Sequence, residues 1–290
     1  MTDGLTVSVV VPAHDAAEHI AEQLAALRSQ DAPWLEEVIV VDNASADDTR
    51  AVVEGVAAEW SKVTVVDEPR PGGNIARNAG ARAATTDGVL LCDADDVVAD
   101  GWIAALRAAL VGQDLVRGRY DLARLNDPDT IAARGPVAAT SGPAPGRPVN
   151  GLGGNCGFRK AAWEQLGGLA EHHYGSDEEE LFWRAHLAGL RVGYVEDAVV
   201  HYRLRPSYRD LYRQQRAWAS NRAQLYREFG RYGFISRRSW PAAVKGWGWL
   251  AVHLPDAWSD DPTRRGCWVR AAAHNVGAVR GSVRHRVVYP

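Results

Sequence analysis

Short apolar runs alternate with segments of helical spacing along the first third of the chain. Four of these runs are rich in valine, isoleucine and leucine and are short enough to be buried strands. They cover residues 6–11, 38–41, 63–66 and 88–92. Between them, apolar residues recur every three or four positions, which predicts helices at 17–29, 49–60 and 75–84. Strands that alternate with helices are typical of an α/β fold with a mainly parallel sheet flanked by helices.

The pattern is less regular after residue 100. A strand is predicted at 116–122, and helices are predicted at 160–166 and 178–188, each followed by glycine. A further strand is predicted near 191–194. Residues 126–154 are rich in proline, glycine and alanine and have no periodicity, so we predict a long loop there.

Polar side chains follow three of the predicted strands. Pro12–Asp15 follows the first, Asp42–Asn43 the second and Asp93–Asp96 the fourth. Because ligands bind outside the carboxyl ends of parallel strands, we expect these clusters to gather at one edge of the sheet. Asp93 and Asp95 lie two positions apart, so within a strand they would share a face. Clustered carboxylates repel unless a cation lies between them, and their hard oxygens suit Mg²⁺ or Mn²⁺. The alternative is a solvated acidic turn or a helix cap.

The composition is that of an ordinary globular protein, with 46% hydrophobic and 24% charged residues among 290. No run of about 18 apolar residues predicts a transmembrane helix, and the first residues lack the pattern of a signal peptide. The three cysteines are far apart and odd in number, which favours a reducing compartment, so we expect a cytoplasmic protein. Cys92 lies in a predicted core strand and is interpreted as a small buried residue.

Charge is unevenly distributed, although the net charge is only −3. Residues 202–290 contain 17 Lys+Arg and 5 Asp+Glu, and they include a predicted arginine-rich helix at 208–229. The apolar face of that helix comprises Leu211, Trp218, Leu225 and Phe229. One hypothesis is that this region contacts the anionic inner face of a membrane. The alternative is a helical appendage that packs on the rest of the chain or on a second subunit. No motif accompanies the basic residues that would indicate nucleic-acid binding.

The order of motifs resembles that of the family 2 glycosyltransferases, which are inverting enzymes with the GT-A fold. Each motif alone is weak, but together they follow the family's order over roughly residues 5–205. They are Val9–Asp15, Val40–Thr49, Ala76–Gly80, Leu91–Asp96, Gly153–Arg159, Leu166–Leu169, Asp177–Arg184 and Val199–His201.

The resemblance implies a GT-A (Rossmann-like) domain at residues 1–205. Its donor half would cover about 1–100 and its acceptor half about 101–205. A basic, tryptophan-containing helical extension would follow at 206–290.

The resemblance also implies a nucleotide-diphosphate sugar donor and a divalent metal, Mn²⁺ or Mg²⁺. Asp95 is expected to touch the ion directly, with Asp93 nearer the ribose or a bound water, and His201 is expected to complete the metal shell. The family often has Asn where this chain has Asp15. The donor contacts that carry over are Pro12, Ala13, Asp15, Asp42, Arg77, Asp93, Ala94 and Asp95.

The family's general base lies in an acidic pair at the start of a helix, which here is Asp177 and Glu178. Glu178 falls at the base position, where the family usually has Asp, so both residues remain candidates. The alternative is that these carboxylates only interact with the helix dipole in a first turn. The resemblance places an acceptor-side loop at Gly153, Gly154 and Asn155.

The expected function is therefore transfer of a sugar, with inversion, to an acceptor hydroxyl in glycan, polysaccharide or glycoconjugate biosynthesis. The acceptor could be a carbohydrate, a lipid-linked molecule or a small molecule, and assembly into a homo-oligomer is left open. One alternative is a nucleotidyltransferase on a related fold, which would want a glycine-rich basic loop after the first strand. The other is a non-catalytic nucleotide- or sugar-binding protein, which would show degraded site motifs.

Overall fold

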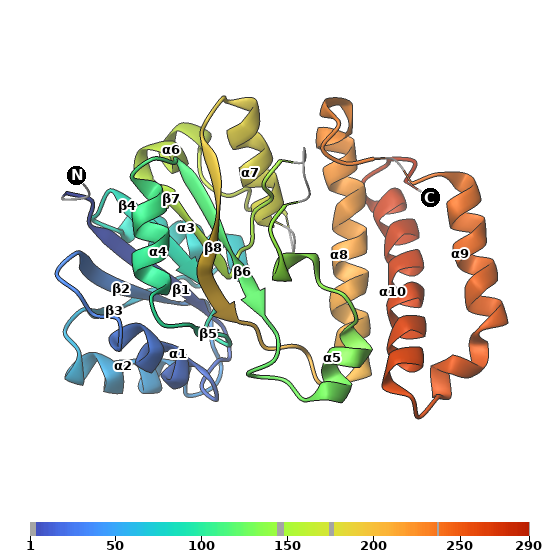
Figure 1. Ribbon diagram of the computed structural model, residues 1–290, viewed down its shortest axis with the longest axis horizontal. Coiled ribbons are helices and arrows are strands. Elements are labelled where there is room, and N and C mark those ends of the chain that lie inside the picture. The colour runs from blue at the N-terminus through green and yellow to red at the C-terminus, as the bar shows by residue number, and fades with distance from the viewer. Residues whose placement is uncertain (1–3, 144–147, 174–176, 237, 290) are drawn as a thin grey trace. The chain divides into compact units, whose positions relative to one another are not determined.

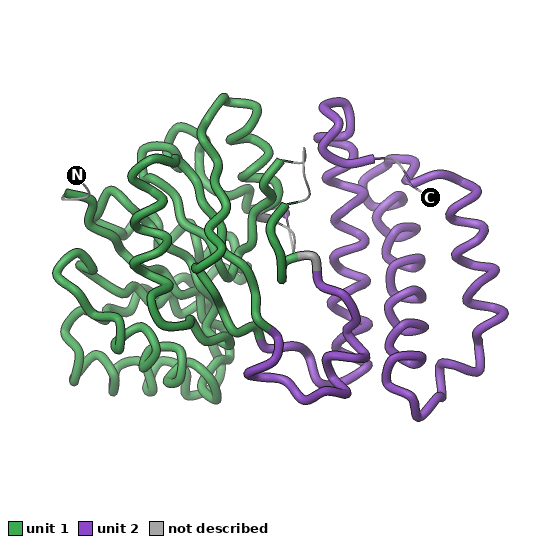
Figure 2. Tube along the Cα trace, viewed as in Figure 1, with its two compact units in different colours: residues 1–121, 139–172, 177–202 green, residues 122–138, 173–176, 203–290 purple. Residues whose placement is uncertain are grey.

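The computed structural model describes residues 4–143, 148–173, 177–236 and 238–289. The chain divides into two compact units (Figure 2). Unit 1 comprises residues 1–121, 139–172 and 177–202, and unit 2 comprises residues 122–138, 173–176 and 203–290. No helix among the described residues is both long enough and apolar enough to cross a membrane.

Unit 1 is built on an eight-stranded sheet with the order β3-β2-β1-β4-β7-β6-β8-β5 (Figure 1). The strands are β1 Val7–Ala13, β2 Leu35–Asp42, β3 Val63–Asp67, β4 Gly88–Cys92, β5 Val97–Val98, β6 Leu115–Asp121, β7 Asn155–Arg159 and β8 Val192–His201. The four strands β3, β2, β1 and β4 are parallel, which confirms the pattern predicted for the first third of the chain. Strand β7 is antiparallel to both β4 and β6, and β5 is antiparallel to β8, so the whole sheet is mixed.

Helices cover both faces of this sheet (Figure 1). They are α1 Ile20–Arg28, α2 Thr49–Glu59, α3 Gly73–Ala83, α4 Trp102–Leu110, α6 Lys160–Leu166 and α7 Asp177–Leu187. One core cluster joins α3, α6 and α7 to alternate strand residues such as Val10, Leu91 and Phe158. Trp163 stacks on Phe158 in this core, and Trp183 is 2% exposed, so both indole rings are buried.

The predicted long loop at 126–154 is wrong in its first part, which contains helix α5 (Pro128–Arg134) and later a short 3₁₀ helix, η1 (Ala138–Thr140). Asp127 caps α5, because its side chain accepts a hydrogen bond from the N–H of Thr130 at 2.8 Å. Aspartate followed by proline is a common helix start, but seven residues are too few to show a period. Residues 122–138 belong to unit 2.

Unit 2 consists mainly of α5 and three longer helices, and α10 lies between α8 and α9 in Figure 1. Its other elements are α8 Tyr208–Phe229, η2 Gly230–Tyr232, α9 Trp240–Val252, η3 Leu254–Trp258 and α10 Pro262–Arg284. The bounds of α8 match the helix predicted at 208–229. Gly277 and Gly281 let α10 approach the backbone of α8, because an added Cβ would meet the carbonyls of Arg216 and Ser220 within 2.5 Å.

The residues predicted to form the apolar face of α8 are largely buried. Leu211, Leu225 and Phe229 are at most 6% exposed. These three side chains are therefore not available to a membrane, although one hypothesis from the sequence placed the membrane contact in this region.

Gly118 in β6 tests how tightly the centre of the sheet is packed. An added Cβ would lie 1.9 Å from the carbonyl oxygen of Ala198 and 2.5 Å from Oδ1 of Asn155. We expect Gly118→Ala to lower the free energy of unfolding by about 2–3 kcal/mol, because the backbone of β8 must move. Urea denaturation measures this change.

Gly55→Ala in α2 is the matched control, since nothing lies within 4 Å of its added Cβ. Alanine should stabilise that helix by about 0.5–1 kcal/mol. Equal effects of the two substitutions would contradict the close packing at Gly118.

Candidate functional site

The carboxyl ends of three parallel strands form one edge of the sheet. Strand β1 ends with Pro12 and Ala13, β2 ends with Asp42, and Asp93-Ala94-Asp95 follows β4. The three strands are neighbours in the order β2-β1-β4. The polar clusters therefore gather at the sheet edge where ligands bind in α/β proteins, as the sequence predicted.

The acidic segment lies in the turn that leads from β4 into β5. Asp93 and Asp95 are half-buried, and both lie beyond the last residue of β4, so their spacing does not place them on one face of a strand. Gln23 of α1 is fully buried beneath this turn. Its Nε2 donates to the backbone oxygen of Asp93 at 2.9 Å, and its Oε1 accepts from the N–H of Val98 at 3.0 Å. One side chain therefore holds both ends of the turn.

The Asp93 carboxylate is enclosed on two sides. Arg77 of α3 donates through Nη2 to Asp93 Oδ1 at 2.7 Å, and the two side chains are 12% and 26% exposed. On the other side, a Cβ added at Gly154 would lie 2.5 Å from Asp93 Oδ2. Arg77, which the resemblance placed among the donor contacts, thus forms an ion pair with Asp93 of the acidic turn. A guanidinium at this position reduces repulsion among the clustered carboxylates.

His201 is the last residue of β8, and the sheet register brings it to the acidic turn. It pairs with Val97 of β5, which follows Asp95 by two residues, and with Asp121 of β6. Its Nδ1 lies 2.8 Å from Asp121 Oδ2. Because a carboxylate only accepts hydrogen bonds, Nδ1 is the donor, which leaves Nε2 as the ring nitrogen that points away from Asp121. This arrangement is typical of histidines that bind a metal through the second ring nitrogen.

The loops after β1 and β2 hold each other in place. Asp15 donates from its backbone N–H to Ser45 Oγ at 3.2 Å, and its Oδ1 accepts from the N–H of Ala46 at 2.7 Å. Asp42 Oδ1 accepts from the N–H of Ser45 at 3.1 Å. Asp15 has φ 48°, in the left-handed region, which costs energy for a residue other than glycine. Both carboxylates therefore shape these two loops.

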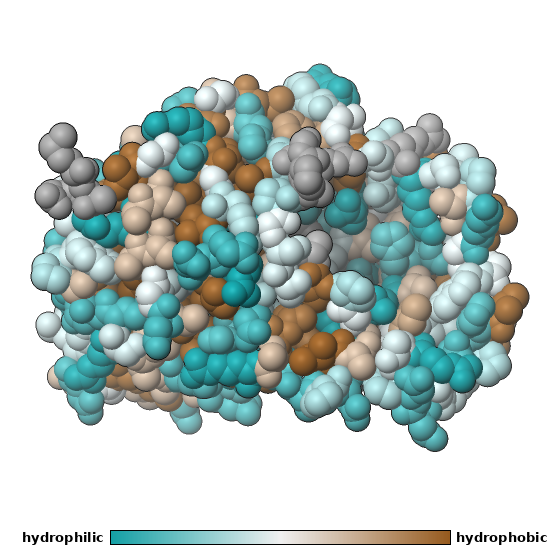
Figure 3. Space-filling model, viewed as in Figure 1, coloured by the Kyte–Doolittle hydropathy of each residue, from teal (hydrophilic) through white to brown (hydrophobic). Residues whose placement is uncertain are grey.

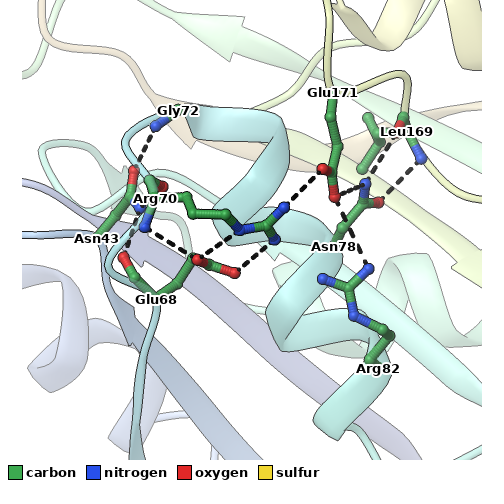
Figure 4. Close-up of polar contacts among 8 residues, drawn as sticks. All are labelled: Asn43, Glu68, Arg70, Gly72, Asn78, Arg82, Leu169 and Glu171. Carbon is green, nitrogen blue, oxygen red and sulfur yellow. Dashed lines mark hydrogen bonds and ion pairs between the residues drawn. The ribbon is translucent and has the colours of Figure 1, made fainter.

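A polar network joins the loop after β3 to the segment that precedes α7 (Figure 4). Glu68 and Arg70 form an ion pair at 2.9 Å, and Arg70 also reaches Glu171 at 3.2 Å. Asn78 of α3 donates to the oxygen of Leu169 at 2.8 Å and accepts from its N–H at 2.9 Å. Residues 169–171 are thus fixed to α3 shortly before the helix that carries the base candidates.

The acceptor-side loop runs directly into β7. Gly153 and Gly154 are buried, and Gly154 has no space for a side chain because of Asp93. Asn155 is fully buried, and its Oδ1 accepts from Nε1 of Trp102 at 2.8 Å. Its Nδ2 donates to two backbone carbonyls, at 2.7 and 3.0 Å. Its buried amide therefore positions the loop.

The side chains of the two base candidates, Asp177 and Glu178, lie outside the described residues. The backbone of α7 begins at Asp177. Within the described part of this helix, Glu180 is buried and forms an ion pair with Arg184. Arg184 also donates to the carbonyl of Gly168 at 2.6 Å. Glu180 therefore anchors α7 and is not a candidate base.

The residues at the acidic turn are of the types that bind a divalent cation, although the ligand atoms of Asp93, Asp95 and His201 do not all lie within 4.8 Å of one another. Asp93 and Asp95 supply hard oxygen donors, His201 supplies an oriented imidazole, and all three are half-buried. Because Gly154 has no side chain, its backbone approaches Asp93 Oδ2 closely without a clash. Burial raises the pKa of the Cys92 thiol well above its ordinary value, so this neighbour stays protonated and supplies no thiolate.

Three positioning residues were not identified from the sequence: Gln23, Asn78 and Asp121. Gln23 lies on a predicted helix, where a single polar residue carries no distinguishing pattern. Asn78 lies within the Ala76–Gly80 motif, but that motif alone did not indicate a role for its side chain. Asp121 ends a predicted strand, and a carboxylate at a strand end was a usable signal. Its partner, His201, is 80 positions away in the sequence, so the pair could not be inferred.

Family models match two overlapping parts of the chain. The model described as glycosyl transferase family 2 matches residues 8–129, and the model described as glycosyl transferase family group 2 matches residues 88–259. An uncharacterized glycosyltransferase of Mycobacterium tuberculosis is 41% identical over 117 residues, which are 40% of this chain and 49% of that protein. The chain thus spans about half the length of this curated relative.

Solved structures share the fold at low sequence identity. One is a mannosyltransferase from Pyrobaculum calidifontis in complex with GDP-Man and Mn²⁺, with a TM-score of 0.65 at 21% identity. The match covers 94% of this chain and 87% of the mannosyltransferase chain. Residues 1–349 of Staphylococcus aureus TarS, in complex with UDP-GlcNAc, have a TM-score of 0.55 at 20% identity and cover 99% and 93%. The second family model alone spans more than half of the sequence. The chain therefore belongs to the family 2 glycosyltransferases and has their GT-A fold.

Proposed function

We propose that this chain transfers a sugar from a nucleotide-diphosphate donor to an acceptor hydroxyl, with inversion at the anomeric carbon. The observation that carries this proposal is the sheet register, which places His201 opposite Val97, two residues after Asp95, with the imidazole oriented by Asp121. Two similar structures hold GDP-Man with Mn²⁺ and UDP-GlcNAc, which supports a nucleotide-sugar donor.

Inverting transfer needs stabilisation of the leaving diphosphate and a base for the acceptor hydroxyl. Asp95 would hold Mn²⁺ or Mg²⁺ directly, with Asp93 and His201 as further ligands. When bound, the ion would neutralise charge on the diphosphate. Arg77 keeps Asp93 in place at 2.7 Å, and Gly154 lets the acceptor-side loop approach the same carboxylate.

The nucleoside would lie against the ends of β1 and β2, where Pro12, Ala13, Asp15 and Asp42 form or shape the loops. Glu178, or Asp177 beside it, would take the proton of the acceptor hydroxyl. The network through Asn78 supports this assignment, because it anchors the segment that leads to α7.

We further propose that residues 1–205 act as the catalytic domain and that the basic region at 206–290 brings it to its acceptor. A lipid-linked acceptor at the inner face of a membrane fits this division. The region 202–290 carries 17 Lys+Arg against 5 Asp+Glu, and such a surface is attracted to anionic lipid.

A thermal-shift screen of nucleoside diphosphates and nucleotide sugars tests the proposal, with Mn²⁺, with Mg²⁺ and with a chelator. A ligand at roughly 100 times its dissociation constant stabilises the folded state by about 2.7 kcal/mol. We expect a shift with one nucleotide class that disappears with the chelator. A shift that is unchanged by the chelator would argue against metal use, and no shift with any nucleotide would overturn the proposal.

Substitution of the proposed metal ligand should remove the metal-dependent part of that shift. We expect Asp95→Ala to abolish it, because the ion loses its direct carboxylate ligand. Asp100→Ala is the control, since Asp100 is an exposed carboxylate five positions further along the chain. If Asp95→Ala and Asp100→Ala respond to Mn²⁺ like the wild type, the ion binds elsewhere.

Substitution of the base should separate chemistry from donor binding. We expect Glu178→Gln to keep the nucleotide-dependent shift and to slow donor turnover by at least about 100-fold, since general base catalysis contributes on this order. Turnover is measured as release of nucleoside diphosphate, with water as the acceptor. Full turnover in Glu178→Gln, together with loss in Asp177→Asn, would move the assignment to Asp177.

The orientation of His201 by Asp121 makes a prediction about metal affinity. Asp121→Leu should weaken Mn²⁺ binding by about 10–100-fold, because the imidazole loses the acceptor that fixes its tautomer. Asp121→Asn should lose less, since the amide oxygen still accepts from Nδ1–H. Electron paramagnetic resonance of free Mn²⁺ during a titration measures both variants.

Asp197→Asn, an exposed change on the same strand as His201, serves as the control for Asp121. Wild-type Mn²⁺ affinity in Asp121→Leu would show that the hydrogen bond has only a structural role.

A further inference from the structure

Helix α9 has two different apolar sides. Ala243 and Leu250 are its buried residues, and Gly246 lies where an added Cβ would be 3.0 Å from Oδ1 of Asn275 on α10. Trp268 of α10 donates from Nε1 to the carbonyl oxygen of Leu250 at 3.2 Å. This side of α9 therefore packs on α10 and explains why the helix folds there.

The other side of α9 is apolar and exposed. Trp240, Val244 and Trp247 are 61%, 68% and 45% exposed, and their spacing of four and three positions places them on one face. The same character continues into η3, where Leu254 and Trp258 are 47% and 72% exposed. We call these five residues the α9 face. Hydrophobic side chains are visible along the outer edge of α9, at the right of Figure 3. The packing of unit 2 does not account for them.

Two of the helices that carry and support this face, α9 and α10, have only basic charged residues, whereas η3 has the buried Asp256, which forms an ion pair with Arg264. Neither α9 nor α10 contains an aspartate or glutamate, whereas α9 has one lysine and α10 has five arginines. On α10, Val279 and Val283 are exposed beside Arg280 and Arg284, which are also exposed. Exposed apolar and cationic side chains thus occur together on neighbouring turns of one helix.

We propose that the α9 face docks on the surface of an anionic lipid bilayer, with α9 lying in the plane of the interface. Tryptophan is enriched at the boundary between headgroups and acyl chains, and basic residues add attraction to anionic lipids. The charge favours lipid over a second copy of this chain, because two such surfaces would bring like charges together. The inference rests on the proposed transferase function and narrows its acceptor to a lipid-linked one.

Vesicle sedimentation tests the proposal with the full chain. Vesicles of phosphatidylglycerol and phosphatidylcholine are compared with vesicles of phosphatidylcholine alone, each at low and high salt. We expect the wild type to bind the anionic vesicles and to lose binding as salt rises. The combined change Trp240→Gln, Val244→Ser and Trp247→Gln should weaken this binding at least about tenfold, because the inserted apolar area is lost.

Val111→Ser is the matched control, since Val111 is an exposed apolar residue of unit 1, at 38%. It should bind vesicles like the wild type. No binding by the wild type at low salt would overturn the proposal, as would equal binding by the triple variant. Equal binding to both vesicle types would also overturn it, because anionic lipid is then not recognised.

A second measurement does not depend on any variant. Phosphatidylglycerol vesicles that contain brominated acyl chains should quench part of the wild-type tryptophan fluorescence, and unquenched emission on bound vesicles would overturn the docking geometry. Sedimentation velocity without lipid should show a monomer, whereas a dimer lost in the triple variant would assign the face to a second copy. Nucleotide-dependent thermal shifts separate the two proposals: if these shifts are retained while vesicle binding is absent, only the docking inference fails.

Discussion

The candidate site depends on strand β8 pairing with two partners at once. Its last residue, His201, lies opposite Asp121 of β6 and opposite Val97 of β5. The first pairing orients the imidazole, and the second brings it to the turn that carries Asp95. A shift of one residue in this register would send the histidine to the other face of the sheet. The antiparallel strand β5 has only two residues, yet it connects the acidic turn at Asp93 and Asp95 to the strand end that carries His201.

The parallel half of the fold could be predicted because each of its strands contains a short, largely apolar run. Strand β4, for example, is buried at every position and reads as an unbroken apolar run. Strand β7 lacks such a run, since it begins with Asn155 and contains Gly157, and β8 was predicted only near 191–194, because its first half is only partly buried. Their identity depends on pairing between distant segments. Helix α5 escaped notice because it is short and packs with α10, far along the chain.

The site could be predicted as a set of positions but not as a set of contacts. Strand-end residues such as Asp42 and Asp93 were identified because a parallel sheet gathers strand ends at one edge. The same reasoning could not show that Arg77 would pair with Asp93. It also could not show that the Asn155 amide would be buried and hydrogen-bonded within the protein. Hydrogen-bond partners that are 16 to 80 positions apart leave no local pattern. Residues 206–290 show the same limit of sequence-based prediction. An apolar helix face can be buried, as in α8, or remain exposed, as in α9, and the sequence does not distinguish the two.

The two hydrogen bonds of Gln23 have a consequence for how tightly the acidic turn can bind. They tie Asp93 and Val98 to α1, so the turn is ordered as part of the folded domain and not by its ligand. The conformational entropy of this loop is therefore lost during folding, and little remains to be lost when a donor arrives. Local opening of α1 would release the turn together with the helix. Affinity at the sheet edge is thus coupled to the stability of a helix that touches no substrate.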